Sequence, residues 1–336
     1  MADIRDFGRM PDGSAVEEVT LAAGDLVVKV ITLGAIIRDV RLAGVPNPLV
    51  LGFDDLDSYL QHSPYFGAVV GRCANRIGNA RFTLDGTTYD LAANEGTTQL
   101  HGGPEGFGRR NWRIVAHDAA SVTLELVSPD GDQGYPGRVT ATCRYTVEAP
   151  ATIRFDAEAT TDAPTLVSLA QHSYFNLDGG ADILDHIVEI DADAVTPTDE
   201  RLIVTGEIRP VAGTDFDRRE AAPIRRHRDG ERIVFDVNYV VGRERAAEPR
   251  HQARLAAANG VALDVWSSEP GVQFYDGSYL NVAVPGLDGR SYGKNGGCCF
   301  EPQLFPDAAN QPGFPSAVLR PGETYRQATR FAFSRS

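Results

Sequence analysis

The sequence RFTLDGTTYDL at residues 81–91 sets the pattern on which the fold prediction rests. Two runs of alternating polar and apolar residues flank Asp85-Gly86, a dipeptide that favours the tight turn of a β-hairpin because its residues accept positive φ. The same alternation returns four more times, with Asp, Gly or Pro between the runs: residues 112–115, 121–127, 139–147 and 152–157. We therefore predict a hairpin at 81–91 within a mainly β chain.

Strands are also predicted on both sides of this region. Residues 16–42 form several, and within them LVVKVI at 26–31 is almost continuously apolar, as is typical of a strand buried on both faces. Asn259-Gly260 favours a hairpin between two strands of the segment 248–266. The remaining predicted strands are residues 187–190, 271–275 and 327–333.

Little helix is expected. Residues 54–61 predict one short helix, with an Asp as N-cap and with Leu56 and Leu60 on one face. Many short strands with regular turn signals indicate an all-β sandwich or barrel. The chain shows no internal repeat and no linker, so we expect one domain over residues 1–336.

Composition narrows the possible partners and compartments. The 336 residues are 42% hydrophobic, enough for a large core, and carry a net charge of −14, which argues against nucleic acid or an anionic membrane as partner. The N-terminal residues lack the pattern of a secretory signal, and no apolar run approaches the roughly 18 residues of a membrane span. The 4 cysteines form no C-x-x-C pair, and we expect Cys298 and Cys299 to be reduced, buried thiols. These features predict a cytoplasmic protein.

Two histidines and a glutamate stand out as candidates for chemistry. His172 lies in LAQHSYFNLDG at residues 169–179, where a strand runs into a Gly-rich turn, and His101 precedes two consecutive glycines that permit close approach of a ligand. Glu301 lies in the apolar segment FEPQLFPD at residues 300–307. Partial desolvation of this carboxyl predicts a pKa nearer to neutral.

Two His and one carboxylate also form the metal triad of non-haem iron proteins, in which the two His are often close in sequence. Here the residues lie on separate segments, a spacing that does not exclude a metal but does not favour one, and we expect none. The segment GRCANRIGN at residues 71–79 lacks the Gly-Lys-Ser/Thr of a phosphate loop, whereas Asn75 and Arg76 are good donors for sugar hydroxyls. An arginine cluster could hold a phosphate, although its many acidic neighbours favour a solvated surface: Arg218, Arg219, Arg225, Arg226, Arg228 and Arg232.

Seven segments, in this order and over nearly the whole chain, closely resemble the aldose 1-epimerases, or galactose mutarotases. They are residues 71–77, 99–103, 132–137, 172–177, 196–200, 271–275 and 301–307. The resemblance implies a large antiparallel β-sandwich with a shallow sugar cleft and no cofactor. It also implies that Glu301 is the general base and His172 the general acid. The residues implied to line the sugar site are Asn75, Arg76, His101, Asp236 and Gln273, with Tyr174 as a further candidate. One departure is Val237, which stands where the family often has His after the aspartate.

The implied activity is the interconversion of α and β anomers of free aldohexoses, by a monomer or homodimer. Alternatives are an epimerase of hexose phosphates, which needs a cationic pocket, and a non-catalytic sugar-binding protein on the same fold. A metal-dependent enzyme is a third alternative, and a chelator would inhibit it.

Overall fold

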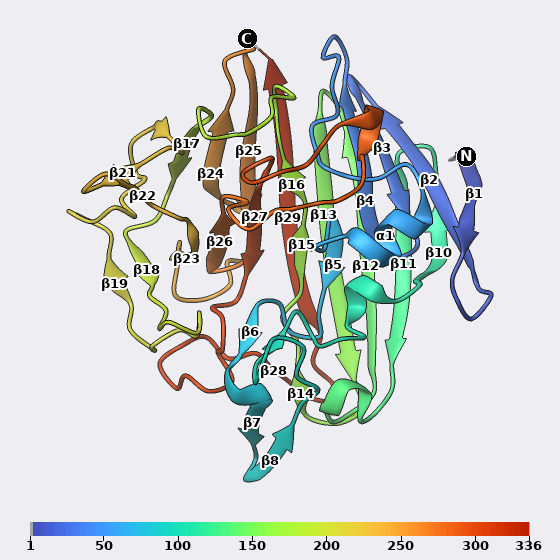
Figure 1. The fold of residues 1–336 in the computed structure, drawn as a ribbon. Helices are drawn as coiled ribbons and strands as arrows, with labels where there is room; N and C mark the ends of the chain where they lie inside the picture. Colours follow the sequence, from blue (N-terminus) through green and yellow to red (C-terminus); the bar gives the residue numbers. More distant parts are fainter. Residues whose placement is uncertain (1–2, 336) are drawn as a thin grey trace.

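The computed structural model describes residues 3–335, and antiparallel strands dominate it (Figure 1). The largest sheet has nine strands, and the hydrophobic alternation seen in the sequence supplies the four strands at one end of it, β10 to β13. In order across this sheet, the nine strands are β10 (Arg113–His117), β11 (Ser121–Ser128), β12 (Val139–Glu148), β13 (Thr152–Thr161), β29 (Tyr325–Arg335), β25 (Val261–Ser267), β24 (Arg250–Ala256), β17 (Ile187–Ile190) and β20 (Ala222–Pro223).

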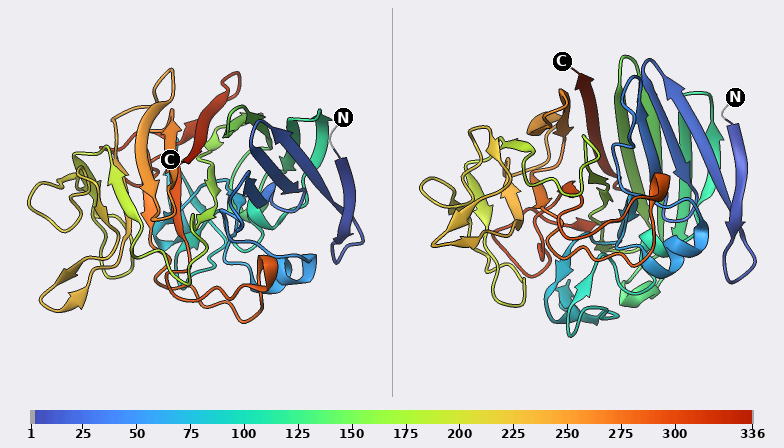
Figure 2. Two further views of the ribbon diagram at one scale, coloured as in Figure 1. Left: turned by 90° about the horizontal axis from the view of Figure 1, so that it is seen from above. Right: turned by 45° about the horizontal axis from the view of Figure 1, so that its top comes forward.

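Two further sheets cover the nine-stranded sheet, each over one half of it (Figures 1 and 2). The four-stranded sheet contains β1 (Asp3–Arg9), β2 (Ala15–Ala23), β3 (Leu26–Ile31) and β4 (Ile36–Leu42). The six-stranded sheet has the order β16 (Tyr174–Phe175), β27 (Cys298–Gln303), β26 (Gly271–Tyr275), β23 (Asp236–Val240), β18 (Ala194–Thr196) and β19 (Arg209–Pro210). One large hydrophobic cluster lies between the layers and takes residues from all three sheets. The predicted all-β sandwich is confirmed.

Short strand pairs and one helix complete the described chain. The pairs are β5 (Ala68–Val70) with β15 (Ala170–His172), β6 (Arg76–Ile77) with β9 (Gln99–Leu100), β7 (Arg81–Leu84) with β8 (Thr87–Asp90), β14 (Thr165–Leu166) with β28 (Val318–Leu319), and β21 (His227–Arg228) with β22 (Glu231–Arg232). Helix α1 (Leu56–His62) begins after Asp55, whose side chain accepts a hydrogen bond from the Ser58 amide. Single 3₁₀ turns lie at Gly78–Ala80, Phe107–Arg109, Asp132–Gly134 and Leu287–Gly289.

Most of the strand predictions are confirmed, and one is wrong in its burial. The hairpin at 81–91 is β7 and β8, and the two strands of 248–266 are β24 and β25. Strand β3 was expected to be buried on both faces, yet Val27 is 38% exposed. Val27 lies on the outer face of the four-stranded sheet, which a second hydrophobic cluster with residues of α1 covers at the end that holds Ile31 and Ile36. Its β-branched shape suits an exposed strand position. Within residues 3–335 no helix is long and apolar enough to cross a membrane.

Candidate active site

The six-stranded sheet carries two neighbouring rows of side chains on the face that borders one cavity. Residues opposite one another on paired strands point to the same face of a sheet, as do residues two apart on one strand. The first row runs across β16, β27, β26 and β23 and consists of Tyr174, Cys299, Tyr275 and Asp236. The second row consists of Glu301, Gln273 and Asn238. The intervening residues, such as Cys298 and Phe300, face the hydrophobic core instead.

His172 enters the cavity from the end of β15. Its backbone pairs with Ala68 on β5, and its carbonyl accepts a hydrogen bond of 3.0 Å from the Gly67 amide. The imidazole lies between two aromatic rings, with centroids 5.9 Å from Tyr65 and 5.2 Å from Tyr174 and interplanar angles of 26° and 25°. Backbone pairing and stacking together fix the orientation of the ring.

His101 and Asn75 hold each other across the junction of β6 and β9. The Asn75 amide donates to Nδ1 of His101 at 3.1 Å, and the His101 amide donates to the Asn75 carbonyl at 3.0 Å. Both residues have positive φ, 61° for Asn75 and 52° for His101, a region that Asn and His tolerate better than most residues. The following Gly102 touches the chain so closely that a Cβ there would lie 1.8 Å from the Gly71 carbonyl oxygen. This loop therefore needs glycine after His101.

The guanidinium of Arg76 is held in place by neighbouring carboxylates. It donates to both carboxylate oxygens of Glu95, at 2.6 and 2.9 Å, and its Nη1 lies 3.9 Å from Asp236. Asp236 in turn accepts a hydrogen bond of 2.7 Å from the Gln273 side chain. A bidentate Arg–carboxylate pair is geometrically specific, so the rest of the guanidinium is held in one direction toward the cavity.

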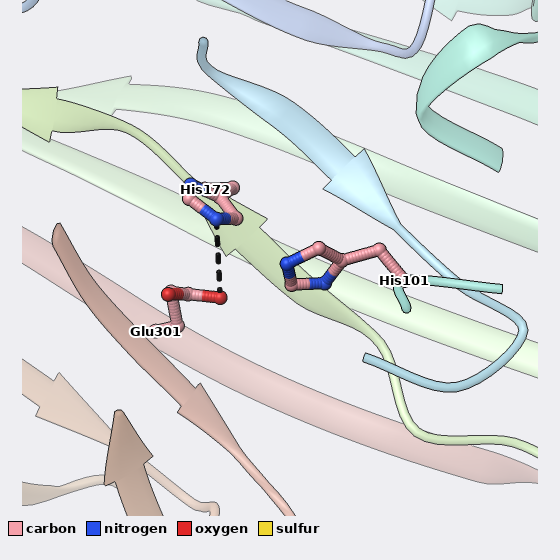
Figure 3. Close-up of side chains that lie close together, drawn as sticks. All are labelled: His101, His172 and Glu301. Atoms are coloured by element: carbon pink, nitrogen blue, oxygen red, sulfur yellow. Dashed lines mark ion pairs between the residues drawn. The ribbon is translucent and has the colours of Figure 1, made fainter. Parts of the chain in front are cut away.

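His172 and Glu301 face each other across the cavity floor (Figure 3). Nε2 of His172 lies 3.6 Å from Oε2 of Glu301, and His101 points toward the same place from the other side. The two side chains are nearly fully buried, and Oε2 of Glu301 has no hydrogen-bond partner within residues 3–335. Because buried polar atoms in proteins are nearly always paired, an orphaned carboxylate oxygen beside an imidazole points to a ligand that completes it.

Burial shifts the pKa values of this pair in opposite directions. Desolvation, with the nearby charge of Asp236, raises the pKa of Glu301 well above its usual value, and Arg76 only partly opposes this. Desolvation lowers the pKa of His172 to about 4. Both shifts favour the neutral forms, a protonated carboxyl on Glu301 and a neutral imidazole on His172. A carboxyl and an imidazole that share one proton form an acid–base pair.

The three residues were also a candidate metal triad, and the structure does bring them together. One possible ligand atom from each of His101, His172 and Glu301 lies within 4.8 Å of the others. However, Nδ1 of His101 accepts the Asn75 amide, so the neutral ring carries its proton on Nε2, which then has no lone pair for a metal. Burial and the neighbouring His172 also lower the pKa of His101, which keeps this ring neutral. The arrangement fits a hydrogen-bond donor better than a metal ligand, and the expectation of no metal stays a prediction.

The cavity contains most of the residues named from the sequence. It has a volume of about 190 Å³, room for a small polar ligand rather than a single water. Seven expected residues line it: Asn75, Arg76, His101, His172, Tyr174, Asp236 and Glu301. Gln273 does not line it but lies behind Asp236 as its hydrogen-bond donor. Larger and smaller hollows exist elsewhere, but this one combines the perturbed acid–base pair with converging polar groups.

Several lining residues were missed from the sequence: Pro64, Tyr65, Leu100, Tyr275 and Tyr279. Tyr275 follows Gln273 by two residues on β26, so strand alternation could have identified it. Tyr65 gave no such signal, because it reaches the imidazoles from a loop through a positive φ of 66°. Glu95, the partner of Arg76, was also missed.

The arginine cluster does not form a cationic pocket. Five of its members pair with aspartates: Arg219 with Asp217 and Asp193, Arg225 with Asp185, Arg226 and Arg228 with Asp215, and Arg232 with Asp276. The solvated mixed-charge surface fits four of these five, but Arg232 pairs with the fully buried Asp276. Arg218 is different and was wrongly placed on the surface: it is 2% exposed, lies 4.5 Å from the centre of the Phe235 ring and donates to backbone carbonyls.

Comparisons with known proteins agree with this geometry. Residues 17–332 match the family described as aldose 1-epimerase. The chain is 43% identical to the galactose mutarotase of Bos taurus, over 98% of this chain and 97% of that protein, and 35% identical to the aldose 1-epimerase of Escherichia coli K12, over 96% of each. A crystal structure of an aldose epimerase homologue from C. elegans superimposes with a TM-score of 0.90 at 31% identity, over 96% of this chain and 99% of that chain. The structure of galactose 1-epimerase from Lactobacillus acidophilus shares the fold, with a TM-score of 0.84 at 24% identity, over 100% of this chain and 99% of that one.

The protein is therefore an enzyme, an isomerase built on the galactose mutarotase fold. It belongs to the aldose 1-epimerase family.

Proposed function

We propose that the protein interconverts the α and β anomers of free aldohexoses such as glucose and galactose, with Glu301 as general base and His172 as general acid. The observation that carries these roles is the buried pair of Nε2 and Oε2, 3.6 Å apart. Anomerisation needs one group to remove the proton of the C1 hydroxyl while another protonates the ring oxygen. A cavity with two such groups side by side suits this requirement.

The pair enters the reaction by moving its shared proton. When a sugar occupies the cavity, transfer from Glu301 to His172 gives a carboxylate and an imidazolium. The carboxylate then takes the proton of the C1 hydroxyl, the bond between C1 and the ring oxygen breaks, and the imidazolium protonates that oxygen. The products are the open-chain aldehyde and two neutral side chains, the forms that burial favours in the empty site.

Ring closure reverses these transfers. Rotation about the C1–C2 bond turns the other face of the aldehyde toward the former ring oxygen. His172 removes the proton of that hydroxyl as its oxygen attacks C1, and Glu301 returns a proton to the C1 oxygen. No proton is gained or lost overall. Each positioned transfer of this kind accelerates a reaction typically by about 10²–10⁴-fold.

The other polar groups hold the pyranose while C1 is free to turn. Arg76 and Asn75 offer donors, Asp236 offers an acceptor, and His101 offers its Nε2 proton. Binding through hydroxyls away from C1 keeps the sugar in place during rotation, which lowers the entropic part of the barrier.

Polarimetry of freshly dissolved α-D-glucose and α-D-galactose tests the proposal. We expect faster decay of the optical rotation to the same equilibrium value, unchanged by EDTA. Inhibition by EDTA would favour the metal-dependent alternative. Binding of either sugar without acceleration would favour the sugar-binding alternative, although that role does not explain an acid–base pair with an unpaired buried oxygen.

Turnover of glucose 6-phosphate tests the remaining alternative, an epimerase of hexose phosphates. In the part of the chain described, five of the cluster arginines already pair with aspartates, so a phosphoryl group would compete with these carboxylates. We expect free glucose to be the better substrate by kcat/KM. A preference for the phosphate ester would overturn this choice of substrate.

We further propose that the whole chain acts as one domain in the cytoplasm, as a monomer or homodimer. The four cysteines are buried and unpaired, which suits a reducing compartment.

A further inference from the structure

Strand β27 reaches both ends of the His172 imidazole. Cys299 and Glu301 are two residues apart, so their side chains leave the strand on the same face. Oε2 of Glu301 lies 3.6 Å from Nε2, and Sγ of Cys299 lies 3.6 Å from Nδ1. The ring is therefore bracketed by two groups of one strand, and only one of them belongs to the acid–base pair described above.

Cys299 is in a fixed and fully buried position. Its side chain is 0% exposed, and its backbone pairs with Tyr174 on one side and Tyr275 on the other. Burial raises the pKa of this thiol well above its usual value, and the nearby carboxyl of Glu301 adds to the effect. The group at Nδ1 is thus a neutral thiol, and not a thiolate.

The tautomer of His172 follows from the proton on Glu301. Oε2 of Glu301 faces Nε2 at 3.6 Å, too far for a hydrogen bond in the empty site, and a protonated carboxyl can pass its proton only to a nitrogen with a free lone pair. The tautomer that serves this transfer therefore carries the ring proton on Nδ1. That proton faces Sγ of Cys299. Histidines that work as acids and bases more often give this second proton to a carboxylate or a carbonyl, whereas a thiol sulfur is a weak acceptor.

The other groups around the ring do not take this role. Tyr65 and Tyr174 stack on its faces, and His101 meets it edge-on with ring centres 5.0 Å apart. Burial raises the pKa of both tyrosines, so they stay neutral, and His101 is neutral as described. The backbone carbonyl of His172 also interacts with its own ring, but it already accepts the Gly67 amide. Glu301 is the ionisable partner at Nε2, and Cys299 is the side chain that faces Nδ1.

We propose that Cys299 is a positioning residue for the general acid: its sulfur accepts the Nδ1 proton of His172 and so directs Nε2 to Glu301 and the sugar. This inference rests on the proposed function. As a weak acceptor, the sulfur orients the ring but stabilises the imidazolium little, so the ring releases its second proton easily. A stronger acceptor here would make His172 a poorer acid.

Three variants test this role, with Cys298 as the matched control. Cys298 is the adjacent buried thiol, but it faces the core, with Sγ 3.8 Å from the Phe175 carbonyl oxygen. For Cys299→Ala we expect kcat to fall by up to about tenfold, the upper end for one uncharged hydrogen bond, because part of the population holds the wrong tautomer, with KM within about twofold. The acid limb of the pH profile of kcat/KM, which reports the free enzyme and is set by protonation of His172 near pH 4, should move to lower pH. For Cys299→Ser the same limb should move to higher pH, because oxygen is the stronger acceptor.

Cys298→Ala should leave kcat and the pH profile of kcat/KM unchanged. Nitrogen-15 NMR provides a readout that does not depend on turnover. The His172 signals, identified by their absence in His172→Asn, should report a proton on Nδ1 in the native protein and a mixture of tautomers in Cys299→Ala.

The outcomes separate the two proposals. Native pH profiles in both Cys299 variants, or a native His172 proton on Nε2, would overturn the role of the sulfur. A loss of kcat in Cys299→Ala without any change in pH profile or tautomer would also overturn it, because a packing defect alone explains that result. If the native protein lacks mutarotation, the proposed function fails, and the tautomer measurement still decides whether Cys299 orients His172.

Discussion

Oε2 of Glu301 and Nε2 of His172 lie 3.6 Å apart at positions that are only 2% and 4% exposed. Neither group is neutralised by an ion pair of its own, and their pKa values shift in opposite directions. A buried polar atom without a hydrogen-bond partner costs stability, so a purely structural role does not explain this pair. The pair is best explained by its chemistry.

Removing either group should abolish most turnover. For Glu301→Gln and His172→Asn we expect kcat to fall by about 10²–10⁴-fold, because each variant loses one of two proton-transfer groups. Polarimetry measures the rate, and circular dichroism checks that the fold persists. His117→Asn, on the exposed β10, serves as the control and should keep native activity. Near-native mutarotation in either site variant would refute the assigned roles.

The same glutamine variant should be more stable than the native protein at alkaline pH. The pKa of Glu301 is raised in the fold, so its contribution to stability is complete below about pH 4.5 and is lost as the pH rises through the folded pKa. Gln has the same shape and never ionises, so it avoids this loss. We expect a gain in the free energy of unfolding of about 1–2 kcal/mol at pH 8, measured by urea denaturation. A difference between variant and native protein that does not change with pH would contradict this account.

Gly102 should be irreplaceable for steric reasons. In Gly102→Ala the new Cβ would lie 1.8 Å from the Gly71 carbonyl oxygen, so the loop that carries His101 must move. We expect a loss of more than about 3 kcal/mol in unfolding free energy, with reduced activity in any folded fraction. Gly86→Ala is the matched control, since its φ of +81° is close to the +86° of Gly102, but no atom lies within 4 Å. It should lose only about 1 kcal/mol, from backbone strain alone. Equal losses in both variants would show that close approach at Gly102 is unimportant.

Arg76→Lys should weaken sugar binding. Lysine keeps the charge but cannot make the bidentate contact with Glu95, so the cation is no longer aimed at the cavity. We expect kcat/KM for galactose to fall by roughly 10–100-fold, mainly through KM, as measured by initial rates over a range of sugar concentrations. Arg81→Lys disrupts an exposed pair with Asp90 outside the cavity and should change nothing. A purely kcat effect in Arg76→Lys would place Arg76 in the chemical step instead.

Local patterns in the sequence predicted much of the fold. The Asp-Gly turn located β7 and β8, and alternation located β11 to β13, because both signals come from neighbouring residues. Strand β27 was harder to identify, since it contains Pro302 and is buried throughout. Pro302 is tolerated there because β16 pairs with β27 only as far as Cys299, which leaves that edge free of ladder hydrogen bonds at the proline.

Part of the candidate site was also predicted from the sequence. The resemblance to a family supplied Glu301, His172 and the lining residues, and seven of the eight expected side chains line one cavity. What the sequence could not provide were contacts between distant segments: Glu95 with Arg76, Tyr65 on His172, and the sulfur of Cys299 at Nδ1. Such contacts depend on the packing of sheets, which no local pattern encodes.

The two rows of side chains on the six-stranded sheet mean that the number of residues in β27 cannot change during evolution without loss of the site. A gain or loss of one residue at the start of β27 would turn Glu301 and Cys299 toward the core and bring Cys298 and Phe300 to the cavity side. No single substitution could repair such a change, because every side chain beyond it would face the wrong way. Loops that join the strands can lengthen or shorten without this penalty. New sugar preferences are therefore more accessible through replacements at the rim and in the loops than through any change in the length of β27.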